Sequence, residues 1–399
     1  MPTTTDDGLE LLTGADAADL LTAAIEPAGG RLLHWSLRDV DHRPSDRTTV
    51  SYNATVAWPD GERVETLGAS TSTGAPPPGP VVTDGDRHVQ VWRFPFDPEL
   101  PGLPGVTFDS TVRELLRSMG HDPEGLQVRV VAYRPRKRAV VEVRFGAGTQ
   151  RMFLKVLRPR AVADVEYRHR LLAEAGVPVP RVLGTSADGV IALEALTGTS
   201  LGSLLMGPHP VPVRADDLLS VLDLFPAQVA ELPRRRAWSA HAVHYAGVVA
   251  SAYPQVSARV HDVAGRIEAA IADDPDGDEP THGDFYEAQL LVADGAVTGL
   301  LDIDTIGPGR RADDLACLLA HLSITAREPA AAAARSALTQ WTQRFELQVD
   351  RRELYARTAG VLMSLATGPY RAQEPGWQAA TVERIELAEQ WLGAGSTRI

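Results

Sequence analysis

Strand-like and helix-like patterns of apolar residues divide the chain into a front part rich in strands and a longer helical part. A helix is predicted over 15–27, and extended stretches at 31–41, 48–58 and 62–70 follow it, joined by the turn signals RPSD and PDG. The proline- and glycine-rich run TSTGAPPPGP is predicted as a loop or linker, and a strand at 88–94 comes after it. The front part is therefore expected to form a β-rich module.

A second block of helix and strands follows the proline-punctuated segment FPFDPELPGLPG. A helix is predicted over 110–119 and leads into a meander of three strands. The next helix, at 160–175, ends at Gly176 and the prolines behind it, and two further strand-like stretches follow. The strands predicted in this block are 126–133, 138–145, 151–157, 181–186 and 189–196.

The two blocks resemble each other around a basic turn. The matching positions lie at a constant offset of 91, which favours a helix-plus-hairpin unit used twice. Convergence on a common hairpin pattern is the alternative. The first copy contains no lysine, and the matching positions are Arg43 with Arg134, Pro44 with Pro135 and Arg47 with Arg138.

Beyond Gly198 the pattern is mainly helical, with one interruption at 281–309. The interruption has the pattern of loop, strand, turn, strand and loop. The sequence therefore predicts a small β-sheet region followed by a helical region that carries one inserted hairpin. The predicted helices are 214–231, 238–251, 255–272, 311–325, 330–345, 351–365 and 380–393.

Length and composition exclude several classes of protein. With 399 residues, 44% of them hydrophobic and 23% charged, the chain is expected to fold into two to three domains rather than to be disordered. No run approaches the ~18 consecutive apolar residues of a membrane-spanning helix. The acidic start MPTTTDDGLELL lacks the layout of a signal peptide, so a cytoplasmic protein is expected. The single cysteine, Cys317, excludes an internal disulfide and is expected in the core.

Charge is unevenly distributed along the chain. The net charge of -13 argues against a general nucleic-acid binder, yet residues 121–180 carry a net +6 between segments of -9 (1–120) and -10 (181–399). A solvated surface and a site for an anion are the two interpretations of the basic segment. Of 39 Lys plus Arg residues, only Lys137 and Lys155 are lysines. A lysine in a strand of such a chain indicates a position where the planar fork of arginine does not serve.

The inserted hairpin carries oxygen-bearing side chains at both outer ends. It begins with His282-Gly283-Asp284, continues through Gln289 and ends at Asp302. Because an antiparallel hairpin brings its outer ends together, the two carboxylates and the amide are expected to face one another. Such a cluster suits Mg²⁺, and a carboxylate there can orient or deprotonate an attacking hydroxyl. Solvated turn aspartates are the alternative, but H-G-D-x-x-x-x-Q followed by strand, turn, strand and L-L-D favours the functional interpretation.

Lys155 and Glu166 form a second candidate pair. Lys155 lies in a predicted strand among apolar residues, and Glu166 follows eleven residues later on the next predicted helix. A strand lysine paired with a helix glutamate and directed at phosphates is the arrangement that kinases use. Taken singly, a solvated strand lysine and an exposed helix glutamate are the alternatives.

Together these motifs resemble the aminoglycoside phosphotransferase-type small-molecule kinases, which are relatives of the protein kinases. The resemblance covers about 126–325 well and the remaining C-terminal part loosely, and it rests on HGDFYEAQLL, VTGLLDIDTIGPGRRADDLACL, FLKVL and IALEALTG. It implies that Asp284 is the catalytic base, that Asp302 is a metal ligand and that Asp314 is a structural aspartate.

The resemblance also implies a nucleotide site. Lys155 would contact phosphates with Glu166 as its partner. Residues 191–198 would form the hinge over which adenine stacks, with backbone groups near Glu194 and Leu196 binding the base. ATP and Mg²⁺ are the implied cofactors.

The sequence departs from the family pattern in two places. The loop asparagine of the family is Gln289 here, as in maltokinase-like members, which could shift the metal by about the length of one methylene. The loop 134–138 lacks the glycines of protein kinases, and its charges are expected either to touch phosphates or to be solvated. His282 is expected to brace the loop through hydrogen bonds, and Asp304 is either a second metal contact or a turn residue.

The sequence thus predicts an α+β, bilobal protein-kinase-like fold with an additional N-terminal β-rich module. The predicted domains are 1–105 (module), 106–197 (nucleotide lobe) and 198–399 (helical substrate lobe).

The expected activity is ATP- and Mg²⁺-dependent phosphorylation of a hydroxyl on a small molecule. The acidic helical lobe favours an amino-sugar or aminoglycoside acceptor, with a neutral sugar second. The alternative function is that of a catalytically silent pseudokinase, which would act as a binding scaffold. No nucleic-acid or membrane partner is expected. The oligomeric state is left open.

Overall fold

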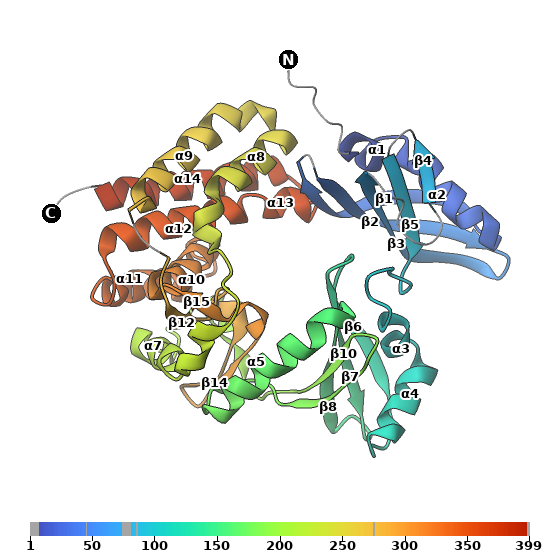
Figure 1. Cartoon of the computed structure of the whole chain (residues 1–399), viewed down its shortest axis with the longest axis horizontal. Coiled ribbons are helices and arrows are strands. Elements are labelled where there is room, and N and C mark those ends of the chain that lie inside the picture. The colour runs from blue at the N-terminus through green and yellow to red at the C-terminus, as the bar shows by residue number, and fades with distance from the viewer. Residues whose placement is uncertain (1–7, 45, 74–80, 85–86, 274–275, 397–399) are drawn as a thin grey trace. The chain divides into compact units, whose positions relative to one another are not determined.

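The structure is a computed structural model that describes residues 8–44, 46–73, 81–84, 87–273 and 276–396 (Figure 1). The chain forms two compact units, each assembled from several segments. The two five-stranded sheets belong mainly to unit 1, and most of the helices belong to unit 2. Unit 1 consists of Met1–Val162, Leu183–Leu193 and Tyr370–Trp377, and unit 2 of Ala163–Val182, Glu194–Pro369 and Gln378–Ile399.

The first sheet of unit 1 is antiparallel and has the strand order β1-β2-β3-β5-β4. Two helices precede it, and their residues Leu12, Leu21 and Ile25 share a core with Val50 and Tyr52 of the sheet. The Tyr52 hydroxyl donates to the Leu12 carbonyl at 2.7 Å, which satisfies the buried polar end of the ring. The elements are α1 (Leu9–Thr13), α2 (Ala17–Ile25), β1 (Arg31–Arg43), β2 (Arg47–Trp58), β3 (Gly61–Thr73), β4 (Val81–Asp84) and β5 (Arg87–Arg93).

The second sheet of unit 1 has the order β6-β7-β8-β10-β9. Its core includes Leu100 and Leu103, which precede the predicted domain boundary at 105, together with Leu116 and Leu154. A cut at that boundary would therefore remove apolar side chains from the core of this sheet. The elements are α3 (Leu103–Thr107), α4 (Asp109–Ser118), β6 (Gln127–Arg134), β7 (Arg138–Phe145), β8 (Gln150–Leu157), β9 (Val182–Thr185) and β10 (Val190–Glu194).

The two sheets share one strand topology. In each, the first three strands form a meander and the fifth strand lies between the third and the fourth. Their first hairpins end on the pairs Arg43–Arg47 and Arg134–Arg138, which are the pairs that the offset of 91 aligns. The sheets differ in that α5 (Val162–Glu174) separates β8 from β9. A common origin of the two sheets stays a prediction, and their shared strand order supports it.

Unit 2 contains two hydrophobic cores. One gathers Phe285, Leu300 and Trp341 around α10, and the other joins α8, α9, α12 and α14. A small three-stranded sheet, β11-β13-β14, and a strand pair, β12-β15, contain the strands of the segment that interrupts the helices. The remaining elements are β11 (Thr199–Ser200), β12 (Glu279–Thr281), β13 (Leu290–Ala293), β14 (Ala296–Leu300), β15 (Gly307–Gly309), α6 (Leu201–Leu205), α7 (Ala215–Asp223), α8 (Ala242–Ala252), α9 (Ser257–Ile271), α10 (Arg311–Thr325), α11 (Ala332–Phe345), α12 (Arg351–Leu365), α13 (Gly368–Arg371) and α14 (Trp377–Ser396).

The α+β fold class predicted from the sequence is confirmed, with local differences. The helix predicted over 214–231 ends at Asp223, because Pro226 disfavours the helical conformation of the residue before it, and a short 3₁₀ helix follows at Ala227–Glu231. The elements α1, α3, β4, α6 and α13 were not predicted, since each has only four or five residues and shows no periodicity. No helix among the described residues is both long enough and apolar enough to cross a membrane.

Candidate active site

The hairpin β13–β14 brings the candidate oxygen ligands to one end. Leu290 pairs with Leu300 in the antiparallel register, and the Leu301 N–H donates to the Gln289 carbonyl at 2.8 Å. Gln289, whose side chain is buried, therefore lies opposite the residue that precedes Asp302. This backbone arrangement follows from the antiparallel pairing expected for the segment.

His282 links the two ends of this segment through its ring. Its Nδ1 accepts from the Asp284 N–H at 3.2 Å, and its Nε2 lies 3.0 Å from the Leu301 carbonyl. Because a carbonyl only accepts, Nε2 carries the proton and Nδ1 is free to accept. Burial lowers the pKa of His282 to about 4, so the ring is neutral near pH 7. His282 thus braces the loop, as expected from the sequence.

Asp314, near the start of α10, clamps the same loop. Its carboxylate accepts from the N–H groups of His282 and Gly283, both at 2.8 Å, and its side chain is fully buried. Gly283 has φ +79, and a Cβ there would lie 2.8 Å from the Thr305 carbonyl, so only glycine fits this turn. The Thr305 hydroxyl in turn donates to the His282 carbonyl at 2.8 Å. These bonds fix the backbone that presents Asp284.

Asp314→Asn should lower the free energy of unfolding by about 1–3 kcal/mol and reduce kcat. An amide relieves the cost of burying a carboxylate whose pKa burial raises to about 7, but it leaves one loop N–H facing an NH₂ group instead of an acceptor. Urea unfolding and steady-state kinetics would measure the two effects. Asp262→Asn, at a mostly exposed position on α9, is the matched control, and equal stability of the two variants would contradict the clamp.

The immediate neighbours of Asp284 include a residue whose position the sequence did not predict. The Cys317 sulfur on α10 lies 4.0 Å from Asp284 Oδ1. Burial, and then the charge of Asp284, raise the pKa of the Cys317 thiol, so it stays protonated and can donate a weak hydrogen bond. Cys317 is buried, as expected, but its contact with Asp284 depends on how α10 packs against the loop.

Asp302 has a backbone conformation uncommon for a residue with a side chain. Its φ of 54 and ψ of 49 lie in the left-handed region, which aspartate tolerates better than most residues. Burial, and after it the charges of Asp284 and Asp302, raise the pKa of Tyr286, so both carboxylates lie near that ring. Tyr286 stacks on His321 with ring centroids 4.0 Å apart. Among the described residues, no group of three or more His, Cys, Asp or Glu side chains is arranged to hold a metal ion by itself.

The two predicted phosphate-site residues belong to different units. Lys155 lies on β8 in unit 1, where its side chain is buried, and pairs across the sheet with Val140. Glu166 lies half-buried on α5 in unit 2. Their pairing therefore stays a prediction.

One buried residue of α5 was missed. The Arg168 guanidinium is paired with Asp164 and donates to the Ile306 carbonyl, in the segment that follows Asp302. This bond ties α5 to that segment within unit 2. The only signal in the sequence was that Arg168 occupies a helix position that faces the core. Because an arginine is almost never fully buried unless it is paired, that position indicated a buried ion pair.

The adenine-binding role of the hinge residues stays a prediction, and the structure shows which backbone groups of Glu194 are already bonded. The Glu194 carboxylate accepts from Arg181 Nε and Nη2 at 2.7 and 2.9 Å, and these hydrogen bonds hold the pKa of Glu194 below its usual value. The Glu194 N–H donates to the Arg181 carbonyl at 2.9 Å. Because the Glu194 N–H is already bonded, the Glu194 carbonyl and the backbone of the half-buried Leu196 are the candidate groups for hydrogen bonds to adenine.

Two cations of the basic loop 134–138, which was expected either to touch phosphates or to be solvated, form ion pairs with acidic side chains. The Arg136 N–H donates to Asp97 at 2.7 Å and its guanidinium pairs with Glu99, while Lys137 Nζ lies 2.7 Å from Asp41 of β1. Arg136 and Lys137 are therefore not simply solvated, and their contact with phosphate stays a prediction. Their acidic partners come from the N-terminal part of the chain, which lies outside the region that the family resemblance covers.

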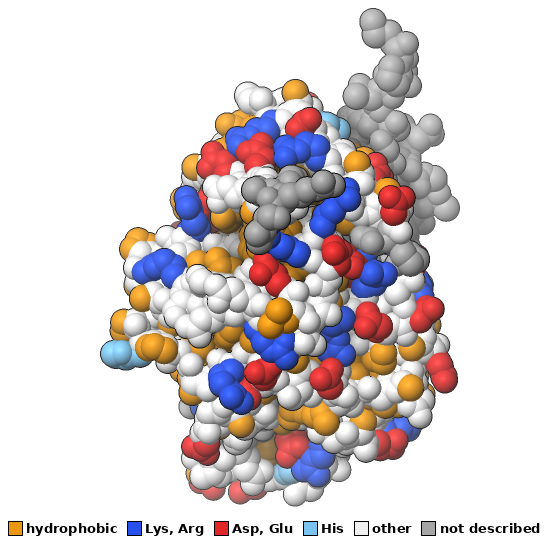
Figure 2. Space-filling model, turned by 90° about the vertical axis from the view of Figure 1, so that its left-hand side faces the viewer, with side chains coloured by type: hydrophobic (Ala, Val, Ile, Leu, Met, Phe, Trp, Pro, Cys, Tyr) orange, Lys and Arg blue, Asp and Glu red, His pale blue; other side chains and the backbone are white. Residues whose placement is uncertain are grey.

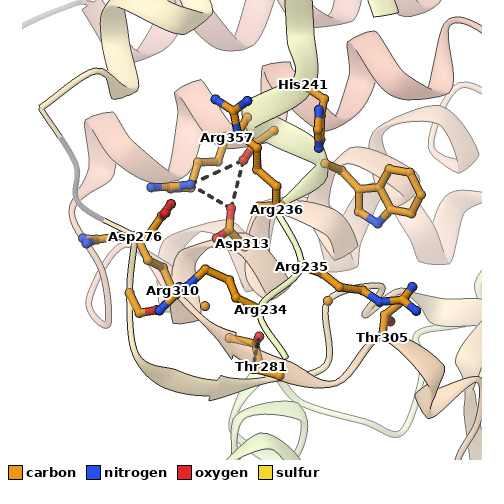
Figure 3. Close-up of a pocket in the computed structure, with 18 of the residues that line it drawn as sticks. Arg234, Arg235, Arg236, His241, Asp276, Thr281, Thr305, Arg310, Asp313 and Arg357 are labelled. Carbon is orange, nitrogen blue, oxygen red and sulfur yellow. Dashed lines mark hydrogen bonds and ion pairs between the residues drawn. The ribbon is translucent and has the colours of Figure 1, made fainter. Parts of the chain in front are cut away.

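A cavity of about 200 Å³ in unit 2 opens beside the loop 282–284, the candidate catalytic loop (Figure 3). Its lining includes Gly283, next to Asp284, and Thr305, and Figure 3 places Arg235 close to Thr305. The sequence interpretation gave the run Arg234–Arg236 no role, although three consecutive arginines were a visible signal. The other lining residues used below are Trp238, His241, Tyr245, Asp276, Arg310, Asp313 and Arg357.

Comparison with known proteins places the chain in a family. A sequence model of the phosphotransferase enzyme family matches residues 138–349, so the chain belongs to that family. It is a small-molecule kinase by class, with a protein-kinase-like fold. No curated protein matches the chain.

Two solved structures of one enzyme, each with a TM-score of 0.51, agree on the fold. The apo form of a thermostable mutant of aminoglycoside phosphotransferase APH(4)-Ia is 15% identical and has a TM-score of 0.51, with 71% of this chain and 99% of that chain covered. A further variant of that enzyme, in ternary complex with AMP-PNP and hygromycin B, is 15% identical with a TM-score of 0.51, covering 72% and 100%. The macrolide 2'-phosphotransferase MphH from Brachybacterium faecium is 21% identical, covers 70% and 98%, and has a TM-score of 0.41.

Proposed function

We propose that the protein transfers the γ-phosphoryl group of ATP to a hydroxyl group of a small molecule, with Mg²⁺ as cofactor. The observation that carries the proposal is the backbone arrangement around His282: its ring links the Asp284 N–H to the Leu301 carbonyl, Leu301 lies opposite Gln289, and Asp314 fixes the loop. Membership of the phosphotransferase enzyme family supports it, and a neighbouring structure holds AMP-PNP. The cytoplasmic location expected from the sequence is part of the same proposal.

The donor set fits the cofactor. Two carboxylates and an amide are the hard oxygen ligands that Mg²⁺ prefers, and the charges of both carboxylates act on the one ring of Tyr286. Asp302 and Gln289 would hold the ion. When bound, Mg²⁺ neutralises phosphate charge.

Asp284 would act on the acceptor. A bond forms between the acceptor oxygen and the γ-phosphorus, the bond from that phosphorus to the β–γ bridging oxygen breaks, and ADP leaves. The hydroxyl proton passes to the Asp284 carboxylate. The His282 and Asp314 contacts keep the loop in place during this step, so that catalysis rests on positioning.

On the donor side, Lys155 is proposed to bind the phosphates with Glu166 as its partner. The base would be held by the Glu194 carbonyl and the backbone of Leu196. The position of Lys155 on β8, the third strand of its sheet, supports this role, because protein kinases direct a lysine of their third strand at the phosphates.

The acceptor expected from the sequence is an amino sugar or aminoglycoside, with a neutral sugar second. The net charge of -10 over 181–399 supports a cationic acceptor, and one neighbouring structure holds hygromycin B. Figure 2 qualifies the charge argument, because on the face that it shows acidic and basic side chains are intermingled and form no broad acidic patch among the described residues. The charge of the acceptor must therefore be inferred from the residues that line the cavity rather than from the net charge.

Lys155→Arg should reduce kcat/KM by more than tenfold, which corresponds to about 1.4 kcal/mol of barrier. The wider guanidinium fork does not fit where a compact ammonium lies in a packed strand. Lys137→Arg is the control, because an arginine there can keep the ion pair with Asp41. Steady-state kinetics of both variants make the comparison, and equal tolerance would remove Lys155 from the phosphate site.

The proposed function is tested by following ADP release with purified protein, Mg²⁺ and ATP against neutral, cationic and anionic sugars. We expect acceptor-dependent ADP release that is lost when EDTA removes Mg²⁺. ATP binding without acceptor-dependent turnover, for every acceptor, would instead favour the silent scaffold.

A further inference from the structure

The cavity beside the catalytic loop is rich in arginine, and its arginines fall into two groups. Arg310 pairs with Glu353, and Arg357 pairs with Glu353 and with Asp313 at 2.9 Å. These two side chains are therefore charge-compensated and stiffen the cavity wall.

The second group comes from the run 234–236. Arg234 pairs with Asp278, but Arg235 and Arg236 make no ion pair within the described part of the chain. Both are exposed and both line the cavity. Of the two acidic residues in the lining, Asp313 is already paired with Arg357, and Asp276 is the other opposing charge. The open part of the cavity thus carries more positive than negative charge.

Aromatic rings complete the lining. The Trp238 and Tyr245 rings lie with their centroids 6.4 Å apart, and the centroid of the His241 ring lies 6.2 Å from that of Tyr245. Burial, and after it the charge of Arg236, lower the pKa of His241, so this ring stays neutral near pH 7. An apolar ring face next to guanidinium groups suits a ring-shaped polyol that carries an anion.

We propose that the acceptor is a hydroxylated small molecule with an anionic group, a carboxylate or a phosphate, that Arg235 binds that group near Thr305, and that Arg236 adds positive charge to the same cavity. The proposal rests on the proposed function, because it names the acceptor of the same catalytic loop. Gly283 lines the cavity next to Asp284, so a molecule anchored there presents its hydroxyl groups to the loop. Arginine matches the planar two-oxygen edge of both anions.

The local charge outweighs the net charge of the helical part. Two uncompensated guanidinium groups repel an ammonium group at the same place, and charges farther away than about 8–10 Å are largely screened at physiological salt. The amino-sugar acceptor drawn from net charge is therefore disfavoured at this cavity.

Binding is tested first, without ATP. Calorimetric titration of the full chain with gluconate, glucose 6-phosphate, glucose and glucosamine separates the two anion sources from neutral and cationic sugars. We expect at least one anionic sugar to bind, and the double variant Arg235→Gln/Arg236→Gln to weaken its affinity by at least about tenfold. Arg352→Gln, an exposed arginine on α12, is the matched control and should bind as wild type does. Preference for glucosamine, or an unchanged affinity in the double variant, would overturn the proposal.

Kinetics then separate this proposal from the proposed function. For the bound anionic sugar, the double variant should raise KM at least about tenfold and leave kcat within a few-fold, because anchoring is lost but Asp284 is intact. If anion binding depends on the two arginines but no acceptor is ever phosphorylated, the proposed function fails and the anion site stands. If phosphorylation proceeds with neutral or cationic sugars and the double variant does not change KM, the proposed function stands and the anionic acceptor is wrong.

Discussion

Asp284→Asn should lower kcat by about 10²–10⁴-fold, because the asparagine amide cannot accept the proton of the acceptor hydroxyl. The affinity for Mg·ATP should remain largely intact, since a base acts in the transition state rather than in the bound ground state. The substitution keeps the shape of the side chain, and the Asp284 N–H can still donate to His282. Steady-state turnover and calorimetric ATP binding measure the two quantities.

Asp294→Asn is the matched control for this experiment. Asp294 is exposed in the turn between β13 and β14, where its φ of 50 suits asparagine equally well. The control should therefore turn over as wild type does. Near-wild-type kcat in Asp284→Asn would remove Asp284 from the proposed role, whatever the control shows.

Asp302→Asn should weaken Mg·ATP binding by at least about tenfold and lower turnover accordingly, because one anionic oxygen ligand becomes a neutral amide. Asparagine is preferred to alanine here, since Asp302 has a left-handed backbone that asparagine adopts with little strain. The loss of charge is thus tested separately from backbone strain. Titration with ATP at a series of Mg²⁺ concentrations gives the measurement.

Raised Mg²⁺ should partly restore ATP binding to Asp302→Asn, because the ion is held less tightly but its other partners remain. Asp304→Asn serves as the comparison and decides between a turn role and a second metal contact. Undiminished Mg·ATP affinity in Asp302→Asn would contradict the metal assignment.

Much of the fold was predictable because its long elements are strongly periodic. The hairpins β1–β2 and β6–β7 and the helices α10 and α12 follow from alternation or helical spacing within one segment. The convergence of Gln289 with the residue before Asp302 was predictable for a related reason, since a short hairpin fixes which residues face each other.

The missing features depend on segments far apart in sequence. The Cys317 contact with Asp284 requires α10 to pack against the loop, and the ion pair of Lys137 with Asp41 joins β1 to a turn almost a hundred residues later. Neither pattern is visible within one window of the sequence. A resemblance to a family could not supply the second contact, because the N-terminal module lies outside the region that the resemblance covers.

The charge around the cavity differs from the net charge of the helical part. Net charge over 181–399 is acidic, yet Arg235 and Arg236 face a cavity next to the catalytic loop. A sum over two hundred residues says little about a site, since screening confines each charge to its neighbourhood. Only the fold shows which charges share a cavity.

The most direct test of the central claim is to identify the product. Wild-type protein, Mg²⁺ and ATP are incubated with the acceptor panel, and the phosphorylated acceptor and ADP are quantified in the same sample by mass spectrometry. The account predicts one phosphorylated acceptor for each ADP released, with neither formed by Asp284→Asn. ADP release without a phosphorylated acceptor, or equal product from wild type and Asp284→Asn, would contradict it.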